Sequence, residues 1–214
     1  KAFRYRLDRA IRRCVMRVMN WLTPAAPEQR ADFRQTEIKK ILLVRSLFRM
    51  GDPILATPAI LLFRKNFPAA QIDFVGPRLA KTLFRNLPID HHYEAARRFP
   101  KVCWSYLALL KRIRKAKYDL AVDVSGSSAA LGSFIVGFSA ARFRVGSKGQ
   151  WDRWFNIRLV RQSSLNKYAV LPELVRSMGL ESPPVYPTLI LSSGEIAEAG
   201  RRLQALITGD AGPV

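Results

Sequence analysis

The stretch between positions 45 and 52 concentrates side chains that can bind polar molecules and move a proton. Its candidate residues are Arg45, Ser46, Arg49, Gly51 and Asp52. Arginine presents forked N–H donors that fit phosphate and carboxylate groups, and a serine hydroxyl can donate or accept a hydrogen bond. An ionised carboxylate can accept a proton, so Asp52 is a candidate general base. These residue types predict a site for a polar or anionic ligand.

Asp52 also has a structural interpretation. The pair Asp52-Pro53 combines a good N-cap residue with a proline suited to the first position of a helix. Residue chemistry alone leaves both roles open. Thr57-Pro58 is a second pair of the same kind, so we expect a kink or a restarted helix at that point.

The neighbouring elements predict that 45–52 is a loop at the carboxyl end of a buried strand. The apolar run 41–44 is short enough for such a strand, and apolar residues with helical spacing follow the loop. In parallel α/β sheets ligands bind at the carboxyl ends of the strands. The loop therefore lies where a ligand is expected.

Strands and helices alternate along the rest of the chain, which predicts an α/β fold with a Rossmann-like parallel sheet and right-handed crossovers. We expect further strands at 71–76, 118–124 and 142–145, a short edge strand at 89–93, and helices at 78–86, 102–117, 127–138 and 166–178. Gly179 is a suitable C-cap, and Ser193 is the expected N-cap of a last amphipathic helix.

The charge of the chain predicts an anionic partner. The 214 residues are 49% hydrophobic and 24% charged, which is the composition of a folded domain and excludes a disordered tail. The formal net charge is +20. Nucleic acid, anionic lipid headgroups and phosphorylated small molecules all fit this charge, which does not separate them.

Residues 1–22 place apolar side chains at helical spacing on one face and arginines on the other. This pattern is typical of a helix in an anionic membrane interface, with Trp21 as an anchor. The alternative is a helix that packs its apolar face on the domain. Along the chain we expect a basic amphipathic helix at 1–24, a linker at 25–37, a Rossmann-like domain at 38–182 and a connection at 183–214.

The sequence predicts no metal site, disulfide framework or transmembrane helix. Cys14 and Cys103 have no ligand spacing, and His91-His92 lacks a third ligand in register. A reducing cytosolic setting is therefore expected. The segment 146–161 is basic and aromatic without a clear period, which favours a functional surface loop. It would be the contact surface if the partner were nucleic acid, but no nucleic-acid motif is present, and nucleic acid is not the expected partner.

Several ordered blocks resemble the heptosyltransferase family, glycosyltransferase family 9, over about residues 38–192. They are Ile41 to Arg45, Gly51-Asp52, Thr57 to Ala59, Phe67 to Ala69, Ile72-Asp73, Tyr118 to Leu120, Asp123, Gly126-Ser127 and Arg144 to Gly146. Enzymes of this family add heptose from ADP-heptose to the inner core of lipopolysaccharide. The resemblance implies a GT-B architecture, in which an N-terminal acceptor domain faces a C-terminal domain that binds the nucleotide sugar.

The resemblance also implies roles for individual residues. The family's candidate catalytic base maps onto Asp52. Its acceptor, a phosphorylated and carboxylate-rich glycolipid, implies acceptor contacts by Arg45, Ser46, Arg49, Gly51, Arg64 and Lys65. Asp123 could orient a sugar hydroxyl, with a structural hydrogen bond as the alternative. The donor is a substrate such as ADP-heptose, and no metal or other cofactor is implied.

On this resemblance the chain holds the acceptor and catalytic-base half of a metal-independent inverting transferase, peripheral on the inner face of the bacterial inner membrane. The isolated chain would lack donor binding and activity. Two alternatives remain: a non-catalytic basic α/β module that binds an anionic membrane surface or nucleic acid, and a family member that keeps the fold without activity.

Overall fold

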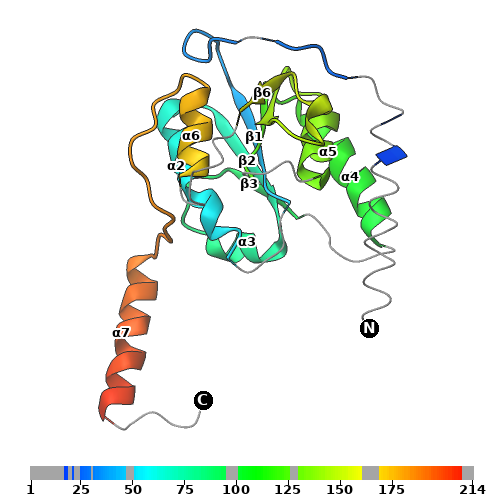
Figure 1. Ribbon diagram of the computed structural model, residues 1–214. Coiled ribbons are helices and arrows are strands. Elements are labelled where there is room, and N and C mark those ends of the chain that lie inside the picture. Colours follow the sequence, from blue (N-terminus) through cyan, green and yellow to red (C-terminus); the bar gives the residue numbers. More distant parts are fainter. Residues whose placement is uncertain are drawn as a thin grey trace.

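One parallel sheet forms the centre of the protein. The computed structural model describes residues 17–18, 21, 25–29, 31–46, 51–94, 101–125, 130–160 and 169–208. Within these ranges six parallel strands lie in the order β3-β2-β1-β4-β5-β6 (Figure 1). The strands are β1 (Lys40–Val44), β2 (Gln71–Gly76), β3 (His91–Glu94), β4 (Leu120–Asp123), β5 (Phe143–Ser147) and β6 (Ile157–Leu159).

Helices cover both faces of the sheet (Figure 1). One face carries α2 (Thr57–Asn66), α3 (Arg78–Leu83) and α6 (Val170–Ser177), and the other carries α4 (Lys101–Ala116) and α5 (Ala130–Phe138). Alternate side chains of a strand point to opposite faces. Ile41 and Leu43 therefore join the first apolar layer, and Leu42 and Val44 join the second. All four are fully buried, which explains why the first strand is a continuous apolar run.

Most of the predicted elements are confirmed. β3 is an edge strand, as expected. The predicted restart of the helix at Thr57 is also confirmed, because a short 3-10 turn, η1 (Ile54–Ala56), precedes α2. Gly179 has a φ of +75° and ends α6, with its N–H donating to the carbonyl of Arg176.

The predicted N-cap of the last helix, α7 (Ser193–Thr208), is wrong by one residue. The side-chain oxygen of Ser192 accepts the N–H of Glu195 at 3.2 Å, and the Glu195 carboxylate accepts the N–H of Ser192 at 2.8 Å. This reciprocal pair is a capping box. Ser192 is therefore the N-cap, and Ser193 is the first helical residue.

The prediction of a surface loop at 146–161 is wrong for the residues that the structure describes there. They include the end of β5, a 3-10 turn, η2 (Asp152–Trp154), and the edge strand β6. Trp151, Trp154 and Phe155 are buried, and Trp154 packs edge-on against Phe134 and Phe138 of α5. The segment has no helical or strand period in its sequence because its large rings are buried, and both tryptophans are part of the core. Because they are buried, the rings of Trp151, Trp154 and Phe155 cannot stack with nucleic-acid bases.

The segment predicted as a linker at 25–37 is packed on the domain. Phe33 is 3% exposed, and its ring meets Phe143 edge-on with 5.4 Å between centroids. The N–H of Ala26 donates to the carbonyl of Arg153 at 2.7 Å. This segment is therefore part of the structured unit.

The predicted basic helix at 1–22 lies outside the described residues except at positions 17, 18 and 21, which are helical. Trp21 is 80% exposed. In the ranges that the structure describes, no helix has the length and apolar character needed to cross a bilayer.

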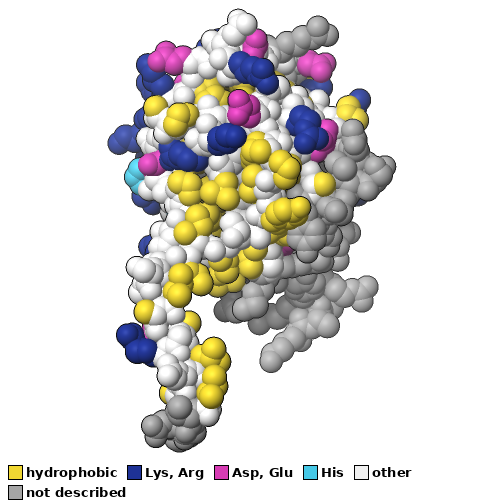
Figure 2. Space-filling view, turned by 90° about the vertical axis from the view of Figure 1, so that its left-hand side faces the viewer, with side chains coloured by type: hydrophobic (Ala, Val, Ile, Leu, Met, Phe, Trp, Pro, Cys, Tyr) yellow, Lys and Arg dark blue, Asp and Glu magenta, His cyan; other side chains and the backbone are white. Residues whose placement is uncertain are grey.

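Helix α7 projects from the domain after an extended connection (Figure 1). Both segments carry exposed apolar side chains: Tyr186, Leu189, Ile190, Leu191, Ile196, Leu203, Leu206 and Ile207. Figure 2 shows one face of the molecule, on which apolar side chains gather over the lower part of the domain and continue along α7. The first turn of α7 is tied to the domain by Asn86, whose amide donates to the Glu195 carboxylate at 2.9 Å.

Candidate functional site

The strand order reverses between β1 and β4, and three of the candidate residues, Arg45, Ser46 and Asp123, lie at that point. Arg45 and Ser46 directly follow β1, and Asp123 is the last residue of β4. Val44 and Asp123 are register partners, so the two strands end side by side. In open α/β sheets ligands bind outside the carboxyl ends of the strands at such a reversal. The topology thus puts the loop at the preferred ligand position of the fold.

Arg45 is a buried cation that links the ends of the two strands. Its side chain is 4% exposed, and Nη1 donates to the carbonyl oxygen of Val124 at 2.6 Å. Nη2 lies 3.8 Å from Oδ1 of Asp52. Burial lowers the pKa of Arg45, while the charges of Asp52 and Asp123 oppose that shift. The guanidinium therefore pairs with Asp52, and the charge of Asp123 also acts on it.

Asp52 lies in the turn between β1 and η1, with 13% of its side chain exposed. The N-cap position of η1 is Pro53, and neither η1 nor α2 has a side-chain capping hydrogen bond. Asp52 therefore does not cap either of these helices. Its carboxylate faces Arg45 on one side and keeps limited access to solvent.

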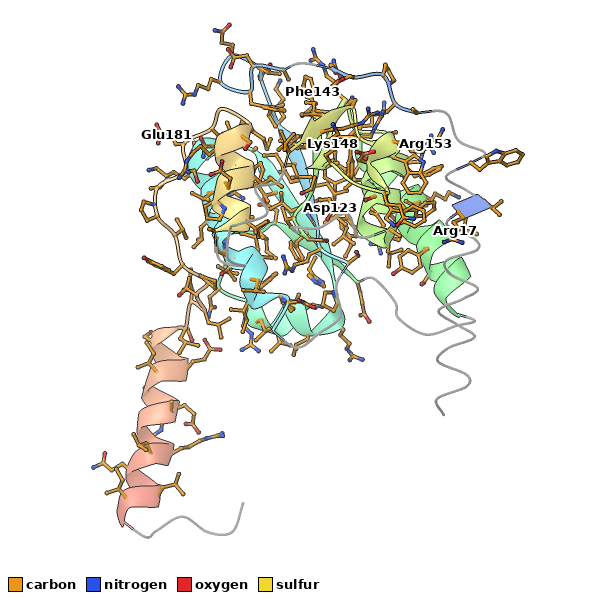
Figure 3. All side chains as sticks on the ribbon, in the orientation of Figure 1. Arg17, Asp123, Phe143, Lys148, Arg153 and Glu181 are labelled. Atoms are coloured by element: carbon orange, nitrogen blue, oxygen red, sulfur yellow. The ribbon has the colours of Figure 1, made fainter. Side chains whose placement is uncertain are left out.

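Asp123 lies in the interior, between the sheet and α5 (Figure 3). It is 2% exposed, and its Oδ1 accepts the N–H of Ser125 at 2.9 Å. Burial raises the pKa of Asp123 to about 7, while hydrogen bonding by Ser125 and the charge of Arg45 act in the opposite direction. The structural hydrogen bond, one of the two predicted roles of Asp123, is therefore formed. A contact of Asp123 with a sugar hydroxyl stays a prediction.

Gly132 lets α5 approach the Asp123 carboxylate. A Cβ atom added to Gly132 would lie 2.8 Å from Oδ2 of Asp123 and 2.9 Å from Oδ1. Both distances are shorter than any ordinary contact of a methyl group. Sequence reasoning missed this role, although a glycine inside an apolar helical run is a signal for close packing.

Gly132→Ala is expected to lower the free energy of unfolding by about 1–3 kcal/mol, because the new methyl group displaces a buried carboxylate. Gly200 of α7 is the matched control, since a Cβ there meets nothing within 4 Å. Gly200→Ala should leave stability unchanged or raise it by up to about 1 kcal/mol through helix propensity. Urea unfolding of both variants measures the difference. Equal effects would contradict the proposed contact.

Arg64 and Lys65 lie in the last turn of α2, and Arg64 contacts the segments that precede β2 and β3. The guanidinium of Arg64 donates to three backbone carbonyls and pairs with Asp90 at 2.8 Å. Lys65 lies 3.5 Å from Glu181 at an exposed position. The structure does not bring these cations to Asp52. Their acceptor contacts stay predictions, and the bonds of Arg64 give it a structural role.

The remaining predicted residues are Ser46, Arg49 and Gly51, which lie between Arg45 and Asp52 in the sequence. Ser46 is 5% exposed, and its buried hydroxyl has no hydrogen-bond partner in the part of the chain that the structure describes. Gly51 is exposed with open space around it. Arg49 lies outside the described residues. Their acceptor contacts stay predictions.

A second buried carboxylate, Asp73 of β2, was not singled out from the sequence. It is fully buried, and the hydroxyl of Tyr118 and the amide of Gln71 donate to it. Nδ1 of the exposed His91 lies 3.0 Å from Oδ1 of Asp73. Across the described ranges, no group of three or more His, Cys, Asp or Glu side chains could hold a metal ion.

No family model and no curated protein matches the chain, but solved structures share its fold. A glycosyl transferase of family 9 from Veillonella parvula superposes with a TM-score of 0.68 at 14% identity, covering 80% of this chain and 51% of that one. Escherichia coli heptosyltransferase WaaC, with ADP-2-deoxy-2-fluoro heptose, superposes with a TM-score of 0.55 at 18% identity, covering 69% of this chain and 51% of that one. E. coli ADP-heptose lps heptosyltransferase II superposes with a TM-score of 0.55 at 19% identity, covering 78% of this chain and 50% of that one. This chain spans about half the length of each.

Proposed function

We propose that this chain is the acceptor-binding half of an inverting GT-B glycosyltransferase of family 9, with Asp52 as the catalytic base. The observation that carries the proposal is the Arg45–Asp52 pair, 3.8 Å apart, at the strand reversal of a domain with the fold of such glycosyltransferases. Because the identity to these structures is below 20%, the likeness supports the fold alone. The assignment of the base rests on the geometry of the Arg45–Asp52 pair.

The proposed mechanism follows from what a sugar hydroxyl needs in order to attack an anomeric carbon. The hydroxyl must lose its proton, and a carboxylate within hydrogen-bond reach can accept it. In an inverting displacement, base and nucleophile act on the face opposite the departing nucleotide. Asp52 has the required partial exposure, and Arg45 orients its carboxylate from the protein side.

The charges around Asp52 favour a neutral group of the acceptor at this point. The Arg45 guanidinium is buried, and the charges of Asp52 and Asp123 already act on it, so it has little positive charge to offer a phosphate. A sugar hydroxyl is uncharged, so it can approach Asp52 without a free positive charge to bind it. Anionic groups of a glycolipid acceptor would bind farther from Asp52, at exposed cations.

The proposed donor is a nucleotide sugar such as ADP-heptose, and the proposed acceptor is the inner core of lipopolysaccharide. Two of the similar structures are named as heptosyltransferases, one of them bound to a fluorinated ADP-heptose. The donor site would lie in a second α/β domain, so the isolated chain is expected to lack activity. No metal or other cofactor is part of the proposal.

The experiment is a transfer assay with the full-length protein, a heptose-free lipopolysaccharide core acceptor and ADP-heptose. Release of ADP and a mass increase of one heptose on the acceptor are the expected results. ADP-glucose and ADP-mannose serve as donor controls. Transfer from one of these instead would keep the glycosyltransferase proposal and change the sugar, whereas no transfer from any nucleotide sugar would contradict the enzyme.

We further propose a peripheral position on the inner face of the bacterial inner membrane, through the basic residues 1–22. Cosedimentation with vesicles should be several-fold stronger with 30% anionic lipid than with neutral lipid, and 0.5 M salt should reduce it, because screening weakens the attraction of arginines to headgroups. A chain that begins at residue 25 is the control. Equal binding to both vesicle types would contradict the electrostatic part.

A further inference from the structure

Helix α4 places three cations on the side that points away from the sheet. Its Tyr106, Leu109 and Ile113 are buried in the second apolar layer. The opposite side, which we call the outer face of α4, consists of exposed residues at helical spacing. They are Leu107, Lys111, Arg114 and Lys115. Because Leu107 is 60% exposed, this face presents an apolar side chain one turn before its cations.

The cations of the outer face have no acidic partner. In the ranges that the structure describes, none of the three forms an ion pair, and α4 contains no acidic residue. The arginines of α6 and α7, by contrast, pair with glutamates of their own helices. The positive charge of the outer face is therefore available to an anionic partner.

The helix dipole explains only part of this arrangement. It favours cations in the last turn of α4, where Arg114 and Lys115 lie, but Lys111 precedes that turn. Lys117, just after the helix, is exposed and has a φ of +54°. Glycine is the usual residue in this left-handed position, so the chain keeps a further cation there at a cost in backbone energy.

We propose that the outer face of α4 is a second contact with an anionic membrane surface, in addition to residues 1–22. Cations beside an exposed leucine are typical of a helix that lies at the headgroups of a bilayer. Nucleic acid would fit the charge but would leave Leu107 unused. The ring of Tyr93, beside α4, already carries the Arg112 guanidinium, 5.6 Å from its centroid. This inference rests on the proposed peripheral membrane position and requires no transfer activity.

Two contacts would also fix the orientation of the domain on the membrane. A single amphipathic segment before residue 25 leaves the domain free to turn about its attachment. A contact through α4 instead sets the plane of the sheet relative to the bilayer, since α4 packs on the sheet through its buried residues. The proposed glycolipid acceptor would then meet the domain from a constant direction.

The test compares two triple variants of the 214-residue chain that lose the same charge at exposed positions of helices. The first changes the outer face of α4: Lys111→Gln, Arg114→Gln and Lys115→Gln. The matched control changes α6 and α7: Arg176→Gln, Arg201→Gln and Arg202→Gln. Binding is measured by cosedimentation with vesicles of about 30% phosphatidylglycerol in phosphatidylcholine.

The α4 variant should bind these vesicles about tenfold more weakly than the wild type, because each cation near an anionic surface strengthens binding several-fold. The control variant should stay within about twofold of the wild type. Thermal unfolding shows whether both variants are folded. Equal losses in the two variants would overturn the inference, since net charge alone would then explain them. Loss of RNA binding without loss of vesicle binding in the α4 variant would overturn it in favour of nucleic acid.

A single substitution tests the apolar part of the contact. Leu107→Gln should weaken vesicle binding about threefold or more at 0.5 M salt, where screening leaves the apolar term dominant. Leu203→Gln of α7 is the matched control, since Leu203 is 59% exposed, and it should bind as the wild type does. Unchanged binding of Leu107→Gln would overturn the inference.

The outcomes also separate this inference from the proposed membrane position. If a chain that begins at residue 25 loses binding while the α4 variants keep it, the contact lies in residues 1–22 alone. That result would overturn the inference and leave the peripheral position intact. Absence of vesicle binding by the wild type would contradict both.

Discussion

Asp52→Asn should reduce glycosyl transfer by about 10²-fold or more, which is the usual contribution of a general base. The asparagine side chain has the same shape and can still accept a hydrogen bond from the acceptor hydroxyl, but it cannot take the proton. The loss should therefore appear in kcat, with KM nearly unchanged. Initial rates of nucleotide release by the full-length protein measure it.

Asp119→Asn is the control for this variant, because Asp119 also accepts hydrogen bonds but lies just before β4, beside the start of β1 and away from the carboxyl ends of the strands. It should keep most of the wild-type rate. Thermal unfolding should show that Asp52→Asn is folded, since the Asp52 side chain is partly exposed and caps neither η1 nor α2. An Asp52→Asn enzyme with more than about a tenth of the wild-type rate, a barrier change below about 1.4 kcal/mol, would exclude the base assignment.

Asp123 should make the protein less stable as the pH rises from about 4 to 7. Its pKa is about 7 in the folded protein, while a carboxyl group of an unfolded chain titrates near 3.9. Between these values the folded state binds more protons than the unfolded state, so the free energy of unfolding falls with increasing pH. One group contributes a slope of about 1.4 kcal/mol per pH unit, or a few kcal/mol over the window.

Asp123→Asn removes this proton, so its stability relative to the wild type should rise through the same window. Urea unfolding of both proteins at several pH values between 4 and 8 gives the difference. Titration of the other groups cancels in that difference, including the effect of the high net charge. A difference that stays constant with pH would show that Asp123 titrates normally and is not desolvated.

The sequence was sufficient to predict the strands and helices that a local pattern defines. The run from Ile41 to Val44 is apolar at every position because both faces of β1 are covered, and this pattern requires no long-range information. The position of Asp52 just beyond that strand follows from the same run. The sequence did not show that Asp52 caps no helix, because a helix could start at Pro53 or at Thr57. Only the folded backbone decides between these two starts.

The burial of Arg45 could not be predicted from its neighbours in sequence. It depends on Val124, which lies 79 positions away and accepts a hydrogen bond from Arg45 only because β1 pairs with β4. Local composition was also misleading at Phe33 and Trp154. Each stands in a polar or basic segment, and each is buried by elements that come much later or earlier in the chain.

The capping box at Ser192 and Glu195 has a consequence for hydrogen exchange along α7. Its first turn has side-chain caps and a bond to Asn86, whereas Leu203, Leu206 and Ile207 are 59% to 77% exposed. A helix of 16 residues without tertiary packing is marginal in water. Amide exchange should therefore be slowest at the first turn and faster toward Thr208, and all of α7 should exchange faster than β1. Uniform protection of α7 at the level of the sheet would show that another surface covers it in solution.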